Sequence, residues 1–136
     1  MSTSYRGPFV GVSAVVVRGG AILLGRRRGA HGPGTWAFPG GKVDAGEDPA
    51  ATVARELHEE TGLRAGRIAE IAWTSDLFPE SGLHYVTLHH LVEAAGEPEV
   101  REPDKADEWR WWPDLDHLPS PLFAPAAALW ATGWRP

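Results

Sequence analysis

The sequence contains no cysteine among its 136 residues, and this absence excludes disulfide bonds, thiolate zinc sites and a cysteine nucleophile. Basic residues are also scarce, because 13 lysines and arginines stand against 18 acidic residues and give a formal net charge of −5. Long nucleic acids require a basic surface, so this charge balance argues against them as partners.

Long hydrophobic runs are missing as well. No segment approaches the roughly 18 apolar residues of a membrane span, and the segment from Met1 to Arg6 lacks the apolar core of a signal peptide. We therefore expect a cytoplasmic protein that does not contact membranes. The length and the ordinary apolar content of 43% predict a single domain over residues 1–136.

The order of apolar and polar segments predicts an α+β sandwich, in which a mixed sheet has a helix on each side. Loops are expected at residues 26–34 and 94–107, which are rich in polar residues, glycine and proline. A closing helix is expected at residues 121–132. Strands are expected at residues 9–17, 21–24, 36–38, 68–74, 84–92 and 108–112.

The clearest predicted element is a helix between Asp48 and Gly62. Asp48 suits the N-cap, Pro49 suits the first helical position, and Gly62 suits the C-terminal stop. The apolar face of this helix is expected to consist of Ala50, Val53, Ala54 and Leu57.

Three glutamates of this helix, Glu56, Glu59 and Glu60, are spaced so that they share a face away from the apolar one. Like charges at this spacing destabilise a bare helix, and magnesium prefers carboxylate oxygens as ligands. The spacing therefore raises the hypothesis of a metal site. The alternative is an acidic helix face in contact with water.

The surroundings of the glutamates favour the metal site. Gly40 and Gly41 allow the backbone to approach closely just before the helix, so that carbonyl oxygens could complete the metal shell. Arg55 stands beside the cluster and could pair with Glu47 or Glu59, which would hold a carboxylate in place.

One segment carries a specific resemblance. Gly41-Lys-Val-Asp-Ala-Gly-Glu47 is followed by seven residues and then by Arg55-Glu-Leu-His-Glu-Glu-Thr-Gly-Leu63. Every fixed position of the Nudix box is present: Gly, five residues, Glu, seven residues, Arg-Glu-aliphatic, one residue, Glu-Glu, one residue, Gly-aliphatic. The chain therefore resembles the Nudix hydrolases.

The resemblance implies an α/β/α sandwich with a central mixed sheet and cleavage of a phosphoanhydride with Mg²⁺, with Mn²⁺ as a substitute. It implies that Glu56, Glu60 and the carbonyl of Gly40 bind the metal, and that Glu59 binds metal or positions water. It also implies that Glu47 and Arg55 stabilise the turn between loop and helix.

The resemblance leaves the general base open. Bound magnesium would neutralise phosphate charge and acidify water, and a glutamate would accept the water proton. Glu59 and Glu60 are candidates for this role. Some Nudix enzymes use an acid from outside the box, for which Glu102, Asp104, Asp107 and Glu108 are available.

Further likeness covers nearly the whole chain and points to the MutT-like nucleoside triphosphate diphosphatases. It lies at residues 24–28, 36–41, 84–87, 102–105, 109–112 and 118–123. These enzymes convert normal, modified or oxidised nucleotides to a monophosphate and pyrophosphate. Lys42 departs from the subgroup, in which many members have histidine. The alternatives are hydrolysis of a nucleotide sugar, dinucleotide or prenyl diphosphate, or a non-catalytic Nudix-fold binding module.

Four residues are candidates for binding the substrate. Arg27 would point inward if Arg26 and Arg28 point outward, and its guanidinium suits phosphate oxygens. Phe38 and Phe123 are candidates to stack on a base, as is Trp36 on its chemistry alone. Thr87 could present a hydroxyl there. For each of these residues the alternative is a purely structural role or contact with water.

The remaining aromatic, histidine and serine residues carry no separate site in the sequence. Core or dimer packing is expected for Trp109, Trp111, Trp112, Trp130 and Trp134, and the surplus of tryptophan raises the hypothesis of a homodimer. The histidines show no zinc spacing, and His89 and His90 are expected on opposite faces of a strand. Ser13 lacks the context of a nucleophile elbow.

Overall fold

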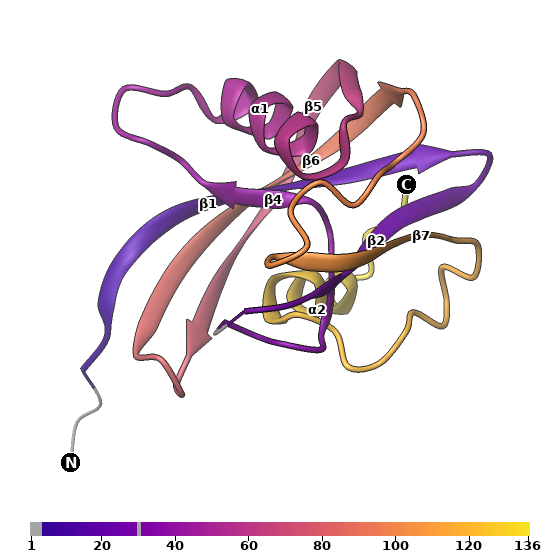
Figure 1. Ribbon diagram of the computed structural model, residues 1–136. Coiled ribbons are helices and arrows are strands. Elements are labelled where there is room, and N and C mark those ends of the chain that lie inside the picture. Colours follow the sequence, from indigo (N-terminus) through magenta and orange to yellow (C-terminus); the bar gives the residue numbers. More distant parts are fainter. Residues whose placement is uncertain (1–3, 30) are drawn as a thin grey trace.

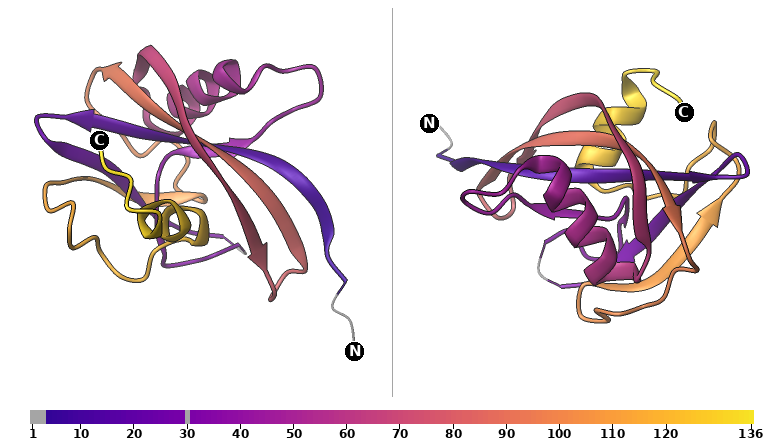
Figure 2. Two further views of the ribbon diagram at one scale, coloured as in Figure 1. Left: turned by 180° about the vertical axis from the view of Figure 1, so that it is seen from behind. Right: turned by 90° about the horizontal axis from the view of Figure 1, so that it is seen from above.

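The computed structural model describes residues 4–29 and 31–136, which form two helices and seven strands in an α+β arrangement. The predicted mixed sheet with two helices is confirmed, and Figure 1 and Figure 2 show α1 and α2 on opposite sides of it. The elements are β1 (Arg6–Arg18), β2 (Ala21–Arg27), β3 (Trp36–Ala37), β4 (Gly40–Lys42), α1 (Pro49–Thr61), β5 (Arg64–Phe78), β6 (Leu83–Ala95), β7 (Ala106–Trp112) and α2 (Ala124–Ala131).

The central strand of the sheet is β1, and its pairing makes the sheet mixed. The strand order is β3-β2-β1-β6-β5, while β4 pairs with β1 and β7 pairs with β2. β1 runs parallel to β6 and antiparallel to β2 and β4. The short strand β4 is thereby tied to the middle of the sheet.

Two hydrophobic cores lie on opposite sides of β1, because successive side chains of a strand point to opposite faces. Val12 and Val16 pack in one core with Val53 and Leu57 of α1. Val15 belongs to the other core, which also contains Ala126, Leu129 and Trp130 of α2. The alternating side chains of β1 thus pack against both helices.

The ends of α1 follow the prediction. Asp48 caps the helix by accepting a hydrogen bond from the backbone N–H of Ala50 at 2.9 Å, and Gly62 ends it with a φ of 79°. Val53 and Leu57 are buried as predicted, but Ala50 is exposed, so its assignment to the apolar face is wrong. Helical spacing predicts which residues share a face, but burial also requires a neighbouring element, which spacing does not show.

Several strands are longer than the sequence pattern predicts, because tertiary pairing extends them. β2 continues through Arg26 and Arg27, which pair with β7, so the loop predicted at 26–34 starts too early. The loop predicted at 94–107 is likewise shorter, since β6 ends at Ala95 and β7 starts at Ala106.

Three further boundaries around the second core differ from the prediction. β3 ends at Ala37, and the strand β4 was not predicted. The closing helix α2 starts at Ala124 and not at residue 121, because Leu122 forms a β-bridge with Trp36.

The tryptophans expected to pack do so. Trp109 and Trp111 pack against the first core, and Trp112, Trp130 and Trp134 belong to or pack against the second. Trp36 is buried in the second core, so the structure does not present it to a ligand. No helix in the described part of the chain is long and apolar enough to cross a membrane.

Candidate active site

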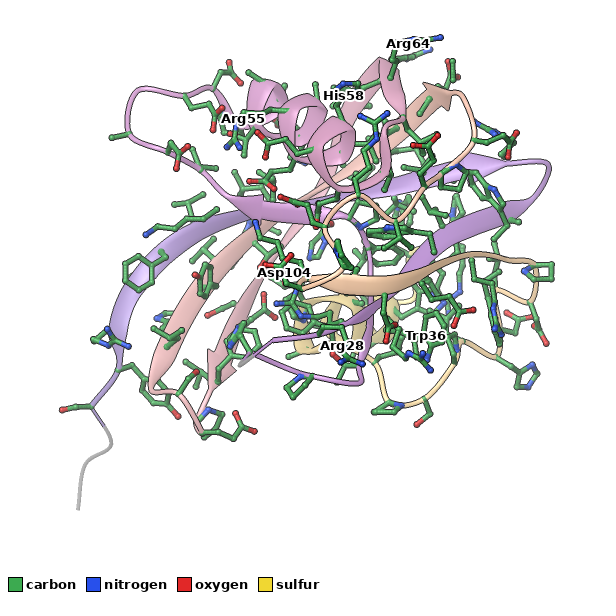
Figure 3. All side chains as sticks on the ribbon, in the orientation of Figure 1. Arg28, Trp36, Arg55, His58, Arg64 and Asp104 are labelled. Carbon is green, nitrogen blue, oxygen red and sulfur yellow. The ribbon has the colours of Figure 1, made fainter. Side chains whose placement is uncertain are left out.

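Arg55 of α1 organises the acidic side chains at the start of the site. Its Nε donates to Oε2 of Glu47 at 2.7 Å, and its NH2 group donates to Oε1 of the same carboxylate at 2.9 Å. Thr52 adds a third hydrogen bond to Glu47 at 2.6 Å. Arg55 and then Thr52 lower the pKa of Glu47 to about 2, so Glu47 is an anion that holds the loop against the helix. Figure 3 shows Arg55 between α1 and this loop.

The guanidinium of Arg55 also contacts two of the three glutamates predicted to share a metal. Its NH1 group lies 3.0 Å from Oε1 of Glu56 and 3.2 Å from Oε2 of Glu59. The side chain of Glu59 is 44% exposed, whereas that of Glu56 is 12% exposed. The structure therefore brings Glu56 toward the interior and leaves Glu59 at the surface, paired with Arg55.

Glu56 and Glu60 meet the paired glycines that precede the helix. The backbone N–H of Gly40 donates to Oε2 of Glu60 at 3.0 Å. A Cβ at Gly41 would lie 2.5 Å from Oε1 of Glu56, so any other residue there would displace this carboxylate. Both glycines lie on β4, which pairs with β1, and the sheet thus fixes the backbone beneath the two carboxylates.

The electrostatics of Glu60 are unfavourable for a lone carboxylate. Burial, and then the negative charge of Glu56, raise the pKa of Glu60 to about 8. Burial also raises the pKa of Glu56, against the opposing effect of Arg55. Two acids that resist ionisation side by side are a suitable place for a cation, because a cation removes both the burial cost and the repulsion.

Glu102, between β6 and β7, contributes to the same region. Its charge raises the pKa of Glu60 further, and its Oε1 atom is buried without a hydrogen-bond partner among the described residues. Buried polar atoms are rarely left unpaired unless an ion, water or ligand satisfies them. Glu56 and Glu60 therefore fit a hard divalent cation, with the charge of Glu102 acting on Glu60 from nearby. No group of three acidic or histidine side chains in the described ranges is arranged to hold a metal ion by itself.

The other acids proposed from outside the box are engaged elsewhere or lie farther along the cavity. Asp107 pairs with Arg26 and Arg28 at 2.9 and 3.1 Å, and Glu108 pairs with Arg110. Asp104 lines the cavity that contains Glu56 and Glu60, and Figure 3 shows Asp104 near Arg28.

A second cavity, with aromatic walls, lies next to the acidic one. His31 packs on Phe78 with ring centroids 4.0 Å apart, and Phe78 packs on Phe123 at 5.4 Å. Tyr85 completes this group, and Phe38 lines the inner side. Thr87 lies at the floor of the same cavity. The sequence predicted Phe38, Thr87 and Phe123 but not His31, Phe78 or Tyr85, whose spacing in the chain gives no signal of a shared site.

Two cations lie where the two cavities join. Arg27 and Lys42 line both cavities, together with His31, Phe38, Gly40 and Gly41. Arg27 points inward, as alternation predicts, and its guanidinium lies 4.0 Å from the centroid of the Phe123 ring. Its Nε donates to the carbonyl of His31 at 3.0 Å. Burial lowers the pKa of Arg27, against the attraction of Glu60. A phosphate chain running from the acids to the aromatic walls would pass the guanidinium of Arg27. The Nζ atom of Lys42 instead lies 4.4 Å from the ring centroid of Phe9, which lines neither cavity.

Replacement of Arg55 tests its organising role. We expect Arg55→Ala to lower kcat/KM about 10- to 100-fold, the usual cost of losing a residue that orients metal ligands. Arg55→Lys should recover part of the loss, because lysine keeps the charge but not the forked geometry. Steady-state kinetics over a magnesium titration measure both, and Arg64→Ala at the exposed start of β5 is the control. Equal losses in Arg55→Ala and Arg64→Ala would contradict the role.

The raised pKa of Glu60 predicts a pH-dependent stability in the absence of metal. Between its ordinary value of 4.5 and about 8, the folded protein retains a proton that the unfolded chain releases. The stabilising contribution is therefore complete below pH 4.5 and is lost as the pH rises through 8. In EDTA, the melting temperature of wild type should fall relative to Glu60→Gln over this interval, and magnesium should reduce the difference. A pH-independent difference would contradict the assignment.

Comparison with known proteins gives the following relationships. The family model described as "NUDIX domain" matches residues 7–131. The structure resembles that of a MutT NUDIX hydrolase from Burkholderia pseudomallei, with a TM-score of 0.83, 39% identity and coverage of 91% of this chain and 97% of that one.

Three relatives with named activities are similar in sequence. The oxidized purine nucleoside triphosphate hydrolase of Danio rerio is 32% identical over 118 residues, which are 85% of this chain and 72% of that protein. The ADP-ribose pyrophosphatase of Methanocaldococcus jannaschii is 31% identical over 121 residues, 88% of this chain and 69% of that one. A Mycobacterium tuberculosis protein named after 8-oxo-dGTP diphosphatase activity is 36% identical over 92 residues, and the match covers 65% of its length.

Proposed function

The chain belongs to the Nudix family, and from this premise we propose that it hydrolyses nucleoside triphosphates to a nucleoside monophosphate and pyrophosphate. The observation that carries the proposal is the continuity of the two cavities. The acids Glu56 and Glu60 line one, the aromatic walls line the other, and Arg27 and Lys42 line both. This order of groups matches a metal-bound phosphate chain followed by a base.

We assign Glu56, Glu60 and the carbonyl of Gly40 to a divalent cation, with Mg²⁺ as the proposed ion and Mn²⁺ as a substitute. When bound, this ion supplies charge neutralisation for the phosphate oxygens and acidifies water. Arg55 and Glu47 hold the acids in place, and Glu59 lies at the outer rim, where it pairs with Arg55. Gly41 has no Cβ atom, which leaves room for the carboxylate of Glu56.

The chain's own residues would carry the phosphate chain and the proton. Arg27 presents its remaining guanidinium N–H groups to phosphate oxygens. Lys42 also lines both cavities, but its ammonium packs on Phe9. Glu102 Oε1, which is buried and unpaired among the described residues, is our first choice to accept the proton of the attacking water. Glu59 and Glu60 are the other candidates for this step.

Hydrolysis of a linked diphosphate is the second candidate function. The acidic cavity continues past Glu60 to Arg28, Lys105 and Trp109, which offers room for a second group on the phosphates. The similarity to the Methanocaldococcus jannaschii ADP-ribose pyrophosphatase points the same way. A prenyl diphosphate fits less well, because the aromatic cavity has a polar floor that includes Thr87.

One assay separates these functions. The protein is incubated with magnesium and a panel of nucleoside triphosphates, nucleotide sugars, dinucleotides and prenyl diphosphates, and the products are identified. Pyrophosphate with a nucleoside monophosphate supports the proposal, whereas turnover of linked diphosphates alone supports the second candidate. Tight binding without any turnover would instead support a binding module. A single domain over residues 1–136, a cytoplasmic location and a homodimer stay predictions.

A further inference from the structure

A hydrogen-bonded network of buried polar side chains lies beneath the aromatic cavity. The proposed hydrolysis does not use this polar network. It consists of Ser13 on β1, Thr87 and His89 on β6, and Thr74 and Asp76 on β5. All five are buried, with exposures of 8% or less. The strands bring them together, because Ser13 lies opposite His89 and Thr74 lies opposite Thr87.

The hydrogen bonds of this polar network determine which group donates and which group accepts at each contact. Asp76 Oδ2 accepts from the hydroxyls of Thr74 and Thr87, each at 2.8 Å. Because a threonine has one hydroxyl hydrogen, Thr74 must accept from Nε2–H of His89, whose Nε2 lies 2.9 Å away.

The donor and acceptor of the hydrogen bond between His89 and Ser13 follow from the same argument. With its hydrogen on Nε2, a neutral His89 has Nδ1 free to accept, so the hydroxyl of Ser13 donates to Nδ1 at 2.6 Å. Burial, and then His90, lower the pKa of His89 to about 4, which keeps the ring neutral near pH 7. The hydroxyl hydrogens of both Ser13 and Thr87 are therefore already used inside the protein.

Ser13 and Thr87 both line the aromatic cavity. Gly11 lies opposite Thr87 and has no side chain to cover the floor; a Cβ there would lie 3.9 Å from Thr87 Oγ1 and 3.3 Å from Tyr85 Cδ1. The floor thus shows a ligand two oxygen atoms that accept hydrogen bonds and have no hydrogen to give. A ligand edge that offers only acceptors would leave these oxygens and its own atoms unpaired.

We propose that Ser13 and Thr87, held by Asp76 and His89, determine specificity by selecting a planar base whose edge carries an amino group. This inference rests on the proposed function for the placement of the base between aromatic walls. Guanine and hypoxanthine form a matched pair, since they differ only in the amino group at C2. A buried acceptor left without its donor costs enough to weaken binding about 10- to 100-fold.

The test compares dissociation constants for GMP and IMP, the products expected from the two triphosphates, by calorimetric titration in magnesium. Wild type should bind GMP about 10- to 100-fold more tightly than IMP. Thr87→Val keeps the shape but removes the oxygen, and Ser13→Ala removes the other, so each should reduce this ratio several-fold. Ser75→Ala is the matched control, because Ser75 bonds His84 on the exposed face of the sheet.

Two results would overturn the inference. Equal binding of GMP and IMP by wild type removes the selection itself. If the ratio of the dissociation constants for GMP and IMP stays unchanged in both Thr87→Val and Ser13→Ala while their melting temperatures fall, the polar network only supports the fold. Failure of the proposed function has a separate signature, because it is absence of triphosphate hydrolysis, whereas the binding ratio is measured without turnover.

Discussion

Glu60→Gln is expected to lower kcat roughly 10²- to 10⁴-fold, the range associated with loss of a group that handles a proton in catalysis. Glutamine keeps the size of the side chain, and its carbonyl oxygen still accepts the hydrogen bond that Gly40 N–H donates to Glu60 at 3.0 Å. The change therefore removes one negative charge beside Glu56 with little change in shape. Steady-state release of pyrophosphate in magnesium measures the effect.

The matched control for this prediction is Glu93→Gln on β6, where the side chain is exposed. It should leave kcat unchanged, and both variants should fold, as measured by thermal unfolding. Wild-type turnover by Glu60→Gln would remove Glu60 from the reaction. Glu102→Gln resolves the proton step: if Glu102 accepts the proton, this variant loses activity while its magnesium requirement stays the same.

The features of the site that depend on local sequence were predictable. Asp48 and Gly62 mark the two ends of α1, because helix capping depends on residues within a few positions along the chain. The structure places both caps as expected. The inward direction of Arg27 followed from strand alternation for the same reason. Helix boundaries and strand faces are thus available from the sequence when neighbours along the chain determine them.

The strand β4 was not predictable in this way. Gly40-Gly41-Lys42 has low β-propensity, and it becomes a strand because Gly40, Gly41 and Lys42 pair with Ser13, Val12 and Gly11 of β1. The different positions of the glutamates depend on tertiary contacts too. Helical spacing puts Glu56 and Glu59 on one face, but it does not show that Arg55 pairs with both while only Glu56 packs on Gly41.

The polar floor of the aromatic cavity lies further from what a sequence can show. Ser13 and His89 are separated by 76 residues, and no pattern along the chain connects them. Their contact exists because β1 and β6 run parallel in a register that places them opposite each other. Registers between distant strands are set by the whole sheet, so the residues that line a cavity across several strands emerge only with the fold.

Arg27→Met should raise KM for the triphosphate about 10- to 100-fold, because a hydrogen bond to a charged group contributes roughly 1.5–3 kcal/mol. Arg27 lines both cavities, and Nε is the one N–H group of its guanidinium that donates to a protein partner among the described residues, which leaves the others free for phosphate oxygens. Arg27→Lys should fall between wild type and Arg27→Met. Lysine keeps the charge, but it loses the stacking on Phe123 and the forked donor geometry.

The neighbouring residue supplies a matched control for this prediction. Arg28→Met removes the same charge one position along the chain, but Arg28 is exposed and pairs with Asp107 at 3.1 Å. Since alternation directs Arg27 inward and Arg28 outward, only Arg27→Met should weaken inhibition by the product pyrophosphate. Equal effects of the two variants would mean that the arginines act through the overall charge of this surface. That result would contradict the proposed contact between Arg27 and the phosphates.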